Sequence, residues 1–237
     1  MKLSIIIPTY NEAESIGVTL ERLALMRGDF EIIVVDGGSA DATVDVARER
    51  KVKVIVSDER GRGTQMHAGA YAANGDVLWF LHADTLPPRD AVERIIAALD
   101  DEEIVGGNCV ISFDGESRAA QFMTWLYPRL RRIGLCYGDS AIFVRRDVYQ
   151  RVGGFQTYPI FEDLDFVWRV RRTGEMIYLP VTVVTSSRRF ENRNFPVVFA
   201  RWAWLQILFW CGVSPHRLGG WYHPVRLTKA NQRQSLK

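Results

Sequence analysis

The stretch from Asp76 to Asp84 constrains the fold more than any other part of the sequence. It begins at a polar turn, runs through an unbroken apolar segment and stops abruptly at His82-Ala83-Asp84. A short apolar run of this kind is typical of a strand that is buried on both faces of a parallel sheet. Because open α/β sheets bind ligands at the carboxyl ends of their strands, Asp84 is a candidate site residue. The alternative is that Asp84 only caps the helix that follows.

The first half of the sequence repeats this pattern. Apolar, β-branched segments alternate with stretches of helical spacing, at residues 3–7, 30–36 and 52–56. Strands that alternate with helices predict parallel pairing and right-handed crossovers, as in a Rossmann-like sheet. The first strand is followed by Pro8-Thr9-Tyr10-Asn11 rather than by a glycine-rich turn, which argues against NAD or FAD. The basic segment of residues 60–65 is expected to be a flexible loop that leads into a helix.

The second half adds further strands and helices to the same fold. We expect strands at residues 104–113 and 141–144, extended segments at 176–179 and 181–186, and helices at 88–99, 116–132, 145–152 and 161–173. Pro128 is expected to kink or break the second of these helices. No repeat, low-complexity tract or linker interrupts the chain. We therefore predict an α/β protein with one domain over residues 1–227 and a polar tail at 228–237.

The composition excludes several classes of protein. A formal net charge of +2 is too small to indicate nucleic-acid binding, although the arginines concentrate in the second half. Three widely separated cysteines argue against a disulfide framework and fit a reducing compartment. The N-terminal apolar run is too short for a signal peptide, and no stretch reaches the roughly 20 apolar residues of a spanning helix. We therefore expect a cytoplasmic protein.

Acidic residues end two of the predicted strands and begin a later helix. Asp36 and Asp84 follow buried strands, and Glu162-Asp163 opens the helix of residues 161–173. Parallel pairing would bring Asp36 and Asp84 to one edge of the sheet, where carboxylates could bind a nucleobase or hold Mg²⁺ or Mn²⁺. A carboxylate at a helix N-terminus is stabilised by the helix dipole. Glu162-Asp163 therefore contains a candidate general base, or is simply a good helix start.

These motifs, in this order, resemble those of the family 2 glycosyltransferases, which are inverting enzymes with the GT-A fold. The resemblance covers most of residues 1 to about 190. It rests on Ile6 to Glu12, Val34 to Thr43, His82-Ala83-Asp84, Tyr137 to Ser140, Val152 to Phe155 and Phe161-Glu162-Asp163. Gly37 stands where the family usually has a second acid, and His82 replaces the first acid of its Asp-x-Asp metal motif. Together with Ser187 to Phe190, the motifs look most like a small bacterial subgroup whose acceptor is unassigned.

The resemblance implies a role for each matching residue. Asp163 is the implied catalytic base, and Asp84 is implied to bind the diphosphate and a divalent cation, Mg²⁺ or Mn²⁺. The implied nucleotide site comprises Pro8, Thr9, Tyr10, Glu12, Asp36, Arg62 and Asp84. The acceptor and phosphate side comprises Gly138, Asp139, Glu162, Arg188 and Arg189, where the arginines suit phosphate oxygens. His82 is either a replacement metal ligand or a structural residue.

The implied fold is a Rossmann-like, mostly parallel central sheet flanked by helices. Residues 1–100 would form a nucleotide-binding half, 101–190 an acceptor and catalytic half, and 191–227 a C-terminal helical extension. The implied reaction moves a sugar from a UDP- or GDP-linked donor to an acceptor hydroxyl, with inversion. One alternative is a non-catalytic protein that binds nucleotide sugars, which the missing acid at His82 favours. Another is a nucleotidyltransferase, although that class would normally show a glycine-rich basic loop after the first strand.

Residues 196–212 form a segment that is apolar almost all round, interrupted only by Arg201 and Gln206. As a helix it would be roughly 25 Å long, which is short for a membrane crossing. A helix of this kind must be buried by something. It packs on its own sheet, forms a homodimer interface, or lies at the inner face of a membrane with nearby arginines against the phosphates. The last reading would suit a lipid-linked acceptor.

Overall fold

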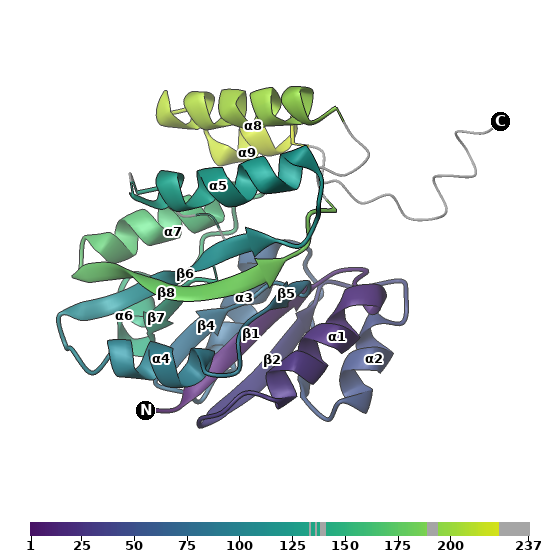
Figure 1. The fold of residues 1–237 in the computed structure, drawn as a ribbon, viewed down its shortest axis with the longest axis vertical. Coiled ribbons are helices and arrows are strands. Elements are labelled where there is room, and N and C mark those ends of the chain that lie inside the picture. The colour runs from purple at the N-terminus through teal and green to yellow at the C-terminus, as the bar shows by residue number, and fades with distance from the viewer. Residues whose placement is uncertain (133, 136, 138–140, 189–193, 223–237) are drawn as a thin grey trace.

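A single eight-stranded sheet forms the centre of the computed structural model, which describes residues 1–132, 134, 135, 137, 141–188 and 194–222. The strand order is β3-β2-β1-β4-β7-β6-β8-β5. Helices cover both faces of the sheet, and the last two helices lie outside this arrangement at one end of the molecule (Figure 1). The predicted α/β class, with a mostly parallel sheet flanked by helices, is confirmed.

The first half of the chain forms the parallel part of the sheet. Its strands are β1 (Leu3–Thr9), β2 (Phe30–Asp36), β3 (Lys53–Val56) and β4 (Val77–Phe80), and each pairs in parallel with its neighbour. The helices between them are α1 (Ala13–Ala24), α2 (Thr43–Glu49) and α3 (Arg62–Tyr71). All four side chains of β4 are buried, as the unbroken apolar run predicts for a central parallel strand. The carboxyl ends of β1, β2 and β4 therefore meet at one edge.

The second half extends the sheet with mixed pairing. Its strands are β5 (Thr85–Leu86), β6 (Ile104–Phe113), β7 (Phe143–Arg145) and β8 (Glu175–Thr185). β7 runs antiparallel between β4 and β6, whereas β6 and β8 are parallel. The helices are α4 (Ala91–Ala98), α5 (Arg118–Arg132), α6 (Arg146–Arg151), α7 (Glu162–Arg171), α8 (Phe195–Trp210) and α9 (Pro215–Gly219).

Several predicted details differ from the structure. The basic segment of residues 60–65 is not wholly a loop, because α3 already begins at Arg62. Gly61 has a φ of 148°, a backbone conformation that glycine adopts readily and that turns the chain into the helix. Pro128 lies inside α5, which continues past it to Arg132, so the proline does not break the helix. The short β5 and α9 were not predicted, since each is too brief to show periodicity.

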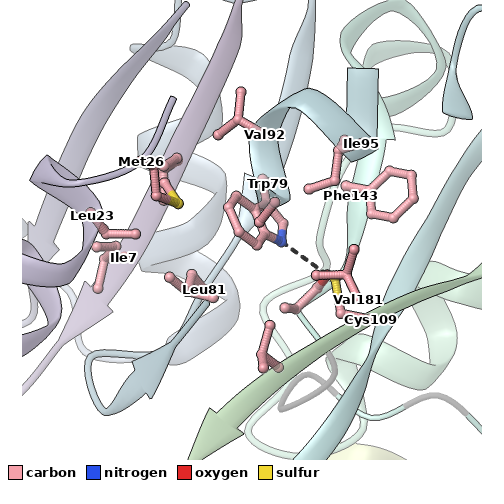
Figure 2. Close-up of a cluster of buried hydrophobic side chains, with 14 of the residues drawn as sticks. Ile7, Leu23, Met26, Trp79, Leu81, Val92, Ile95, Cys109, Phe143 and Val181 are labelled. Atoms are coloured by element: carbon pink, nitrogen blue, oxygen red, sulfur yellow. Dashed lines mark hydrogen bonds between the residues drawn. The ribbon is translucent and has the colours of Figure 1, made fainter. Parts of the chain in front are cut away.

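Two buried clusters lie on opposite faces of the sheet. One packs α1, α2, α4 and α5 against it and contains Trp79, Phe143 and Cys109 (Figure 2). Burial raises the pKa of the Cys109 thiol to about 12, so this cysteine packs as a small apolar group. The other cluster packs α3, α6 and α7, with Phe80 and Phe166 at its centre. A sheet covered on both faces presents its ligand site at the strand ends.

Helix α3 lies very close to the sheet because it carries a glycine where the two meet. A Cβ atom added at Gly69 would lie 2.4 Å from Cγ2 of Ile6 and 3.0 Å from Cγ2 of Val35. Any side chain here would push α3 away from β1 and β2. The close packing brings the N-terminal turn of α3, with Arg62 and Gln65, to the ends of these strands.

Trp79 offers a test of how strongly the core depends on one side chain. It is fully buried, and its indole Nε1 donates a hydrogen bond to the carbonyl of Ala141, 3.1 Å away (Figure 2). Trp79→Ala should lower the free energy of unfolding by about 3–5 kcal/mol, through lost burial and a cavity. Trp79→Phe should cost about 1–3 kcal/mol, because the buried carbonyl loses its donor.

Urea denaturation monitored by circular dichroism measures both changes. The control is Tyr71→Ala, because Tyr71 is 92% exposed and its loss should change stability by no more than about 0.5 kcal/mol. A Trp79→Ala protein as stable as this control would contradict the assigned core.

Candidate active site

A pocket of about 70 Å³ opens at the carboxyl ends of β1 and β4, beside the first turn of α3. Its walls come from four separate segments of the chain. The lining residues are Pro8, Thr9, Tyr10, Glu12, Arg62, Gln65, His82, Ala83, Asp84 and Arg188. Seven of these ten residues were predicted to belong to the site, and His82 was left open as a metal ligand or a structural residue, whereas Gln65 and Ala83 were not predicted. The edge of the sheet that was expected to bind a ligand therefore contains a pocket.

The turns that follow β1 and β2 are tied together by hydrogen bonds. The amide of Asn11 donates to Oγ of Ser39 at 2.8 Å, and the amide of Ala40 donates to Oδ1 of Asn11 at 2.8 Å. The amide of Glu12 donates to Oγ1 of Thr43 at 2.8 Å. Asn11 has a φ of 53°, a left-handed conformation that asparagine tolerates better than most residues. These contacts fix the backbone that carries Tyr10 and Glu12 into the pocket.

Asp41 adds to the same link between the turns. Its carboxylate accepts hydrogen bonds from the amide and hydroxyl of Thr43 and from the amide of Ala13. Partial burial acts to raise the pKa of Asp41, but these hydrogen bonds outweigh it and hold the pKa below its ordinary value. The stability they provide is present at neutral pH and is lost as the pH falls through the lowered pKa.

Asp36 is fully buried at the end of β2, and its carboxylate is already satisfied. Oδ1 accepts from the hydroxyls of Thr9 at 3.0 Å and Ser39 at 2.5 Å. Oδ2 accepts from the amides of Gly38 at 3.0 Å and Ser39 at 2.7 Å. Four donors match the roughly four acceptor positions of a carboxylate. Asp36 thus holds the turn after β2, and its predicted contact with a nucleobase would require one of these donors to be exchanged.

Gln65 fastens α3 to the ends of β1 and β2. Its Nε2 donates to the carbonyls of Thr9 at 2.7 Å and Val35 at 2.8 Å, and the side chain is buried. It lies one helical turn from Arg62, so the same packing fixes both residues. The only signal in the sequence was this spacing of three residues within the basic segment, which does not by itself indicate a buried glutamine.

Arg188 lies between two carboxylates of the pocket. Its Nη2 is 2.6 Å from Oε2 of Glu12 and 2.9 Å from Oδ2 of Asp84. The Glu12 side chain is only 3% exposed and that of Asp84 only 15%, so both are negative groups with little access to water. The chain places a guanidinium at their meeting point. Segments distant in the sequence, after β1, β4 and β8, thus converge on one cation.

Arg62 makes the corresponding contact on the other side of the pocket. Its Nε donates to Oε1 of Glu162 at 2.5 Å, and its Nη2 donates to Oδ2 of Asp163 at 3.3 Å. Both acids lie in the first turn of α7 and are buried, where the helix dipole stabilises negative charge. Oδ1 of Asp163 accepts from the amide of Leu164 at 2.8 Å. Glu162 and Asp163 are therefore held at fixed positions beside the pocket.

The residue before these acids is strained. Phe161 has a φ of 64°, which is unusual for a bulky residue and costs of order 1–3 kcal/mol. Its ring stacks on Phe209 of α8, with centroids 4.8 Å apart, and it belongs to a third buried cluster with Leu164, Leu205 and Leu218. Packing against the C-terminal helices thus stabilises a conformation that aims Glu162 and Asp163 at Arg62.

The structure therefore brings most of the predicted site residues together. Pro8, Thr9, Tyr10, Glu12, Arg62, Asp84 and Arg188 line the pocket, Glu162 and Asp163 contact it through Arg62, and Asp36 supports it through Thr9. Gly138, Asp139 and Arg189 lie outside the described residues. Arg188, which was assigned to the acceptor and phosphate side, lies in the pocket with Glu12 and Asp84.

The donor set at Asp84 fits a hard divalent cation. Within the part of the chain that the structure describes, no three His, Cys, Asp or Glu side chains converge as a complete metal cage. Glu12 and Asp84 do converge on one cationic group, and Mg²⁺ is usually held by one or two carboxylates together with substrate phosphates. These two residues would hold the ion, with the remaining ligands from substrate or water.

Comparisons with known proteins identify the family and the fold. The family model described as glycosyl transferase family 2 matches residues 4–158. The chain is 28% identical over 186 residues to the glycosyltransferase AglE of Haloferax volcanii, covering 72% of this chain and 61% of that protein. It is 34% identical over 197 residues to an uncharacterized glycosyltransferase of Nostoc, covering 75% and 59%. The chain thus spans about three fifths of the length of these relatives.

A solved structure shares the fold. The mannosyltransferase PcManGT from Pyrobaculum calidifontis, in complex with GDP-Man and Mn²⁺, superposes with a TM-score of 0.68 at 23% identity. The match covers 87% of this chain and 61% of that one. At this level of identity the likeness concerns the fold, and it confirms the expected GT-A architecture.

The Arg62–Glu162 contact gives a prediction about the site. Glu162 is 3% exposed in its side chain, so Arg62→Gln leaves a buried carboxylate without its cation. We expect a loss of about 1–3 kcal/mol in the free energy of unfolding. Glu162→Gln removes the charge, so the double variant should lose less than the sum of the single losses, with a coupling of about 0.5–3 kcal/mol.

Urea unfolding of the four proteins in this cycle measures the coupling. The control cycle uses Arg151→Gln and Asp147→Asn, a surface pair whose side chains are 61% and 68% exposed. That pair should couple by less than about 1 kcal/mol. Equal coupling in the two cycles would contradict a buried, charge-compensated site.

Proposed function

The chain belongs to glycosyl transferase family 2, and from this premise we propose that it transfers a sugar from a nucleoside diphosphate to an acceptor hydroxyl, with inversion at the anomeric carbon. One observation carries the proposal. The pocket holds the Arg188 guanidinium between the carboxylates of Glu12 and Asp84, and beside it lies Asp163, which contacts Arg62. A diphosphate leaving group needs the charged pocket, and an acceptor hydroxyl needs a carboxylate that can take its proton.

The donor diphosphate is assigned to the side of the pocket formed by Glu12, Asp84 and Arg188. Guanidinium groups bind phosphate oxygens through paired donors, and Arg188 is already at this place. A Mg²⁺ or Mn²⁺ ion held by Asp84 and Glu12 would neutralise charge on the leaving group. PcManGT, whose structure holds GDP-Man and Mn²⁺, supports this assignment for the shared fold.

The nucleoside is assigned to the turns after β1 and β2. Pro8, Thr9 and Tyr10 line this side of the pocket, and Arg60 lies over the Tyr10 ring at 4.9 Å from its centroid. Asp36 keeps these turns in place through its four hydrogen bonds. In this proposal residues 1–100 bind the donor and residues 101–190 supply the acceptor side, with either a UDP- or a GDP-linked sugar as donor.

Asp163 is the proposed general base. Its Oδ2 takes the proton of the acceptor hydroxyl while that oxygen forms a bond to the anomeric carbon. The bond between the anomeric carbon and the diphosphate oxygen breaks in the same displacement, and the electron pair leaves with the nucleoside diphosphate. Arg62 positions Asp163, and Glu162 in turn positions Arg62. No enzyme nucleophile is needed for a single displacement.

Replacing the base tests the reaction. Asp163→Asn keeps the shape of the side chain but removes its basicity, so kcat should fall by about 10²–10⁴-fold, while donor affinity should change little. Release of nucleoside diphosphate from a panel of UDP- and GDP-linked sugars measures turnover, and calorimetry measures donor binding.

The matched control for this experiment is Asp165→Asn. Asp165 lies in the same turn of α7 but pairs with Arg169 at 2.7 Å, so this variant should keep its activity. Donor binding without turnover in the unmodified protein would favour the non-catalytic alternative. Full activity in Asp163→Asn would remove Asp163 from the mechanism.

Replacing Asp84 tests the donor site. In calorimetry with UDP- and GDP-linked sugars and Mn²⁺, we expect the protein to bind one nucleotide in a metal-dependent manner. Asp84→Ala should weaken this binding by about tenfold or more, since it removes a ligand of the cation. Glu12→Gln should also weaken metal-dependent nucleotide binding.

Asp100→Ala is the control, because Asp100 is an exposed acid after α4 and away from the pocket. Chelation of the metal should reproduce the effect of Asp84→Ala in the unmodified protein. Donor binding that depends neither on metal nor on Asp84 would contradict the metal assignment. Arg62 and Arg188 would then be the groups that bind the diphosphate. Absence of binding by every nucleotide tested would overturn the transferase proposal.

A further inference from the structure

Helix α8 is largely exposed despite its apolar sequence. Of its residues only Leu205 and Gln206 are buried, so α8 as a whole is not core of its own sheet, although Phe195, Phe199 and Trp202 are partly buried against the main core cluster. Exposed side chains recur along one face, with Val197 at 61%, Trp204 at 58%, Ile207 at 46% and Trp210 at 53% exposure. This spacing follows the helical period, so the exposed apolar side chains form a continuous strip.

Helix α5, which contacts the start of α8, also exposes aromatic side chains. In α5, Phe122 and Trp125 are 40% and 52% exposed and stack on each other with centroids 5.9 Å apart. Phe122 also contacts Phe195 and Phe199 at the start of α8, with centroids 6.0 and 5.8 Å apart. We call the exposed residues of α5 and α8 together the aromatic face. Figure 1 shows α8 as the outermost element at this end of the molecule, on the same side of the sheet as α5.

The charged side chains on the helices of the aromatic face are all basic. No acidic residue occurs in α5, α8 or α9. Five exposed arginines lie on these helices: Arg118, Arg129, Arg132, Arg201 and Arg217. Among the described residues, none of these five forms an ion pair. The guanidinium of Arg129 lies 3.9 Å above the Trp125 ring, so cation and aromatic alternate on this surface.

We propose that the aromatic face docks on the surface of an anionic phospholipid bilayer. Tryptophan side chains favour the boundary between headgroups and acyl chains, where the ring is apolar and the indole N–H reaches polar groups. Arginines at the border can lie along the apolar surface and reach lipid phosphates. Within the described residues no helix is long and apolar enough to span a bilayer, so this contact lies in the interface.

Charge favours a membrane over two other candidates for covering the aromatic face, which are a second copy of the chain and residues 223–237. A symmetric dimer through the aromatic face would bring the same arginines of both copies together, because a two-fold contact pairs each patch with itself. Residues 223–237 contain several basic residues and no acidic one, so they too would meet like charge on this surface. An anionic membrane complements both the apolar strip and its basic border.

Docking would also place the candidate active site close to the lipid. Phe209 of α8 stacks on Phe161, the residue before Glu162 and Asp163, and on Trp168 of α7 with centroids 5.5 Å apart. The helix that carries the aromatic face therefore packs directly on the segment that carries the proposed base. This consequence for a lipid-linked acceptor rests on the proposed function, whereas the docking itself does not.

Vesicle flotation with the full chain tests the proposal. The protein should float with vesicles of phosphatidylcholine mixed with phosphatidylglycerol, and much less with pure phosphatidylcholine. Trp204→Ala combined with Trp210→Ala should abolish most of the flotation. Arg132→Gln and Arg217→Gln should each weaken partitioning about fivefold, and added salt should weaken it further.

Matched controls are Tyr71→Ala, an exposed aromatic on α3, and Arg48→Gln, an exposed arginine on α2. Both should float like the unmodified protein. Hydrogen exchange of the unmodified protein gives a measurement that needs no variant: vesicles should protect residues 195–210 and leave residues 43–49 unchanged. These readouts do not depend on catalysis, so they remain informative if no donor is found.

Three results would overturn the proposal. One is no flotation with anionic vesicles and no protection of α8. Another is flotation that the tryptophan replacements leave intact, or that the controls reduce equally. The third is a dimer in light scattering that Trp204→Ala dissociates, which would assign the aromatic face to a second copy of the chain.

Discussion

Buried carboxylates around the pocket are the constraint on which the rest of this structure depends. Glu12, Asp36, Glu162 and Asp163 are all nearly inaccessible to water. A buried carboxylate is costly unless hydrogen bonds or a cation satisfy it. Asp36 is satisfied by neighbouring hydroxyls and amides, whereas Arg188 meets Glu12 and Arg62 meets the pair on α7. The fold must therefore bring two arginines from distant segments to one edge of the sheet.

This requirement explains why supporting elements pack as they do. The glycine on the inner face of α3 lets that helix approach β1 closely, and Gln65 then fastens it to the strand ends beside Arg62. The strained Phe161 is held by its stack on α8 and aims the acids of α7 at the same arginine. Strain of this kind persists only where surrounding packing fixes it. The C-terminal helices thus contribute to the geometry of the site although none of their residues lines the pocket.

The sequence was informative where local chemistry decides the structure. Unbroken apolar runs predicted the parallel strands, and the acids that end them marked the edge where the pocket lies. The sequence could not predict that the Gln65 side chain is buried and hydrogen-bonded to the strand ends. Its burial follows from the close approach of α3 to the sheet and not from its neighbours in the chain. It also left the environment of residues 196–212 open. An apolar helix has the same sequence pattern whether protein, a second copy or lipid covers it. The exposure of Trp204 and Trp210 shows that the outer side of this helix does not pack on its own sheet.

Arg188 deserves particular weight in any account of the mechanism, because it and a divalent cation would compete for the same oxygens. Its guanidinium contacts both carboxylates, Glu12 and Asp84, that would hold the ion. The Arg188 guanidinium and a divalent cation at the same two carboxylates would repel each other unless a further negative group binds there. A diphosphate supplies that charge, so metal and donor should enter together, with Arg188 moving from the carboxylates to the phosphates. In the proposed mechanism the arginine would stabilise the acids while the donor is absent and would then contribute to binding the leaving group.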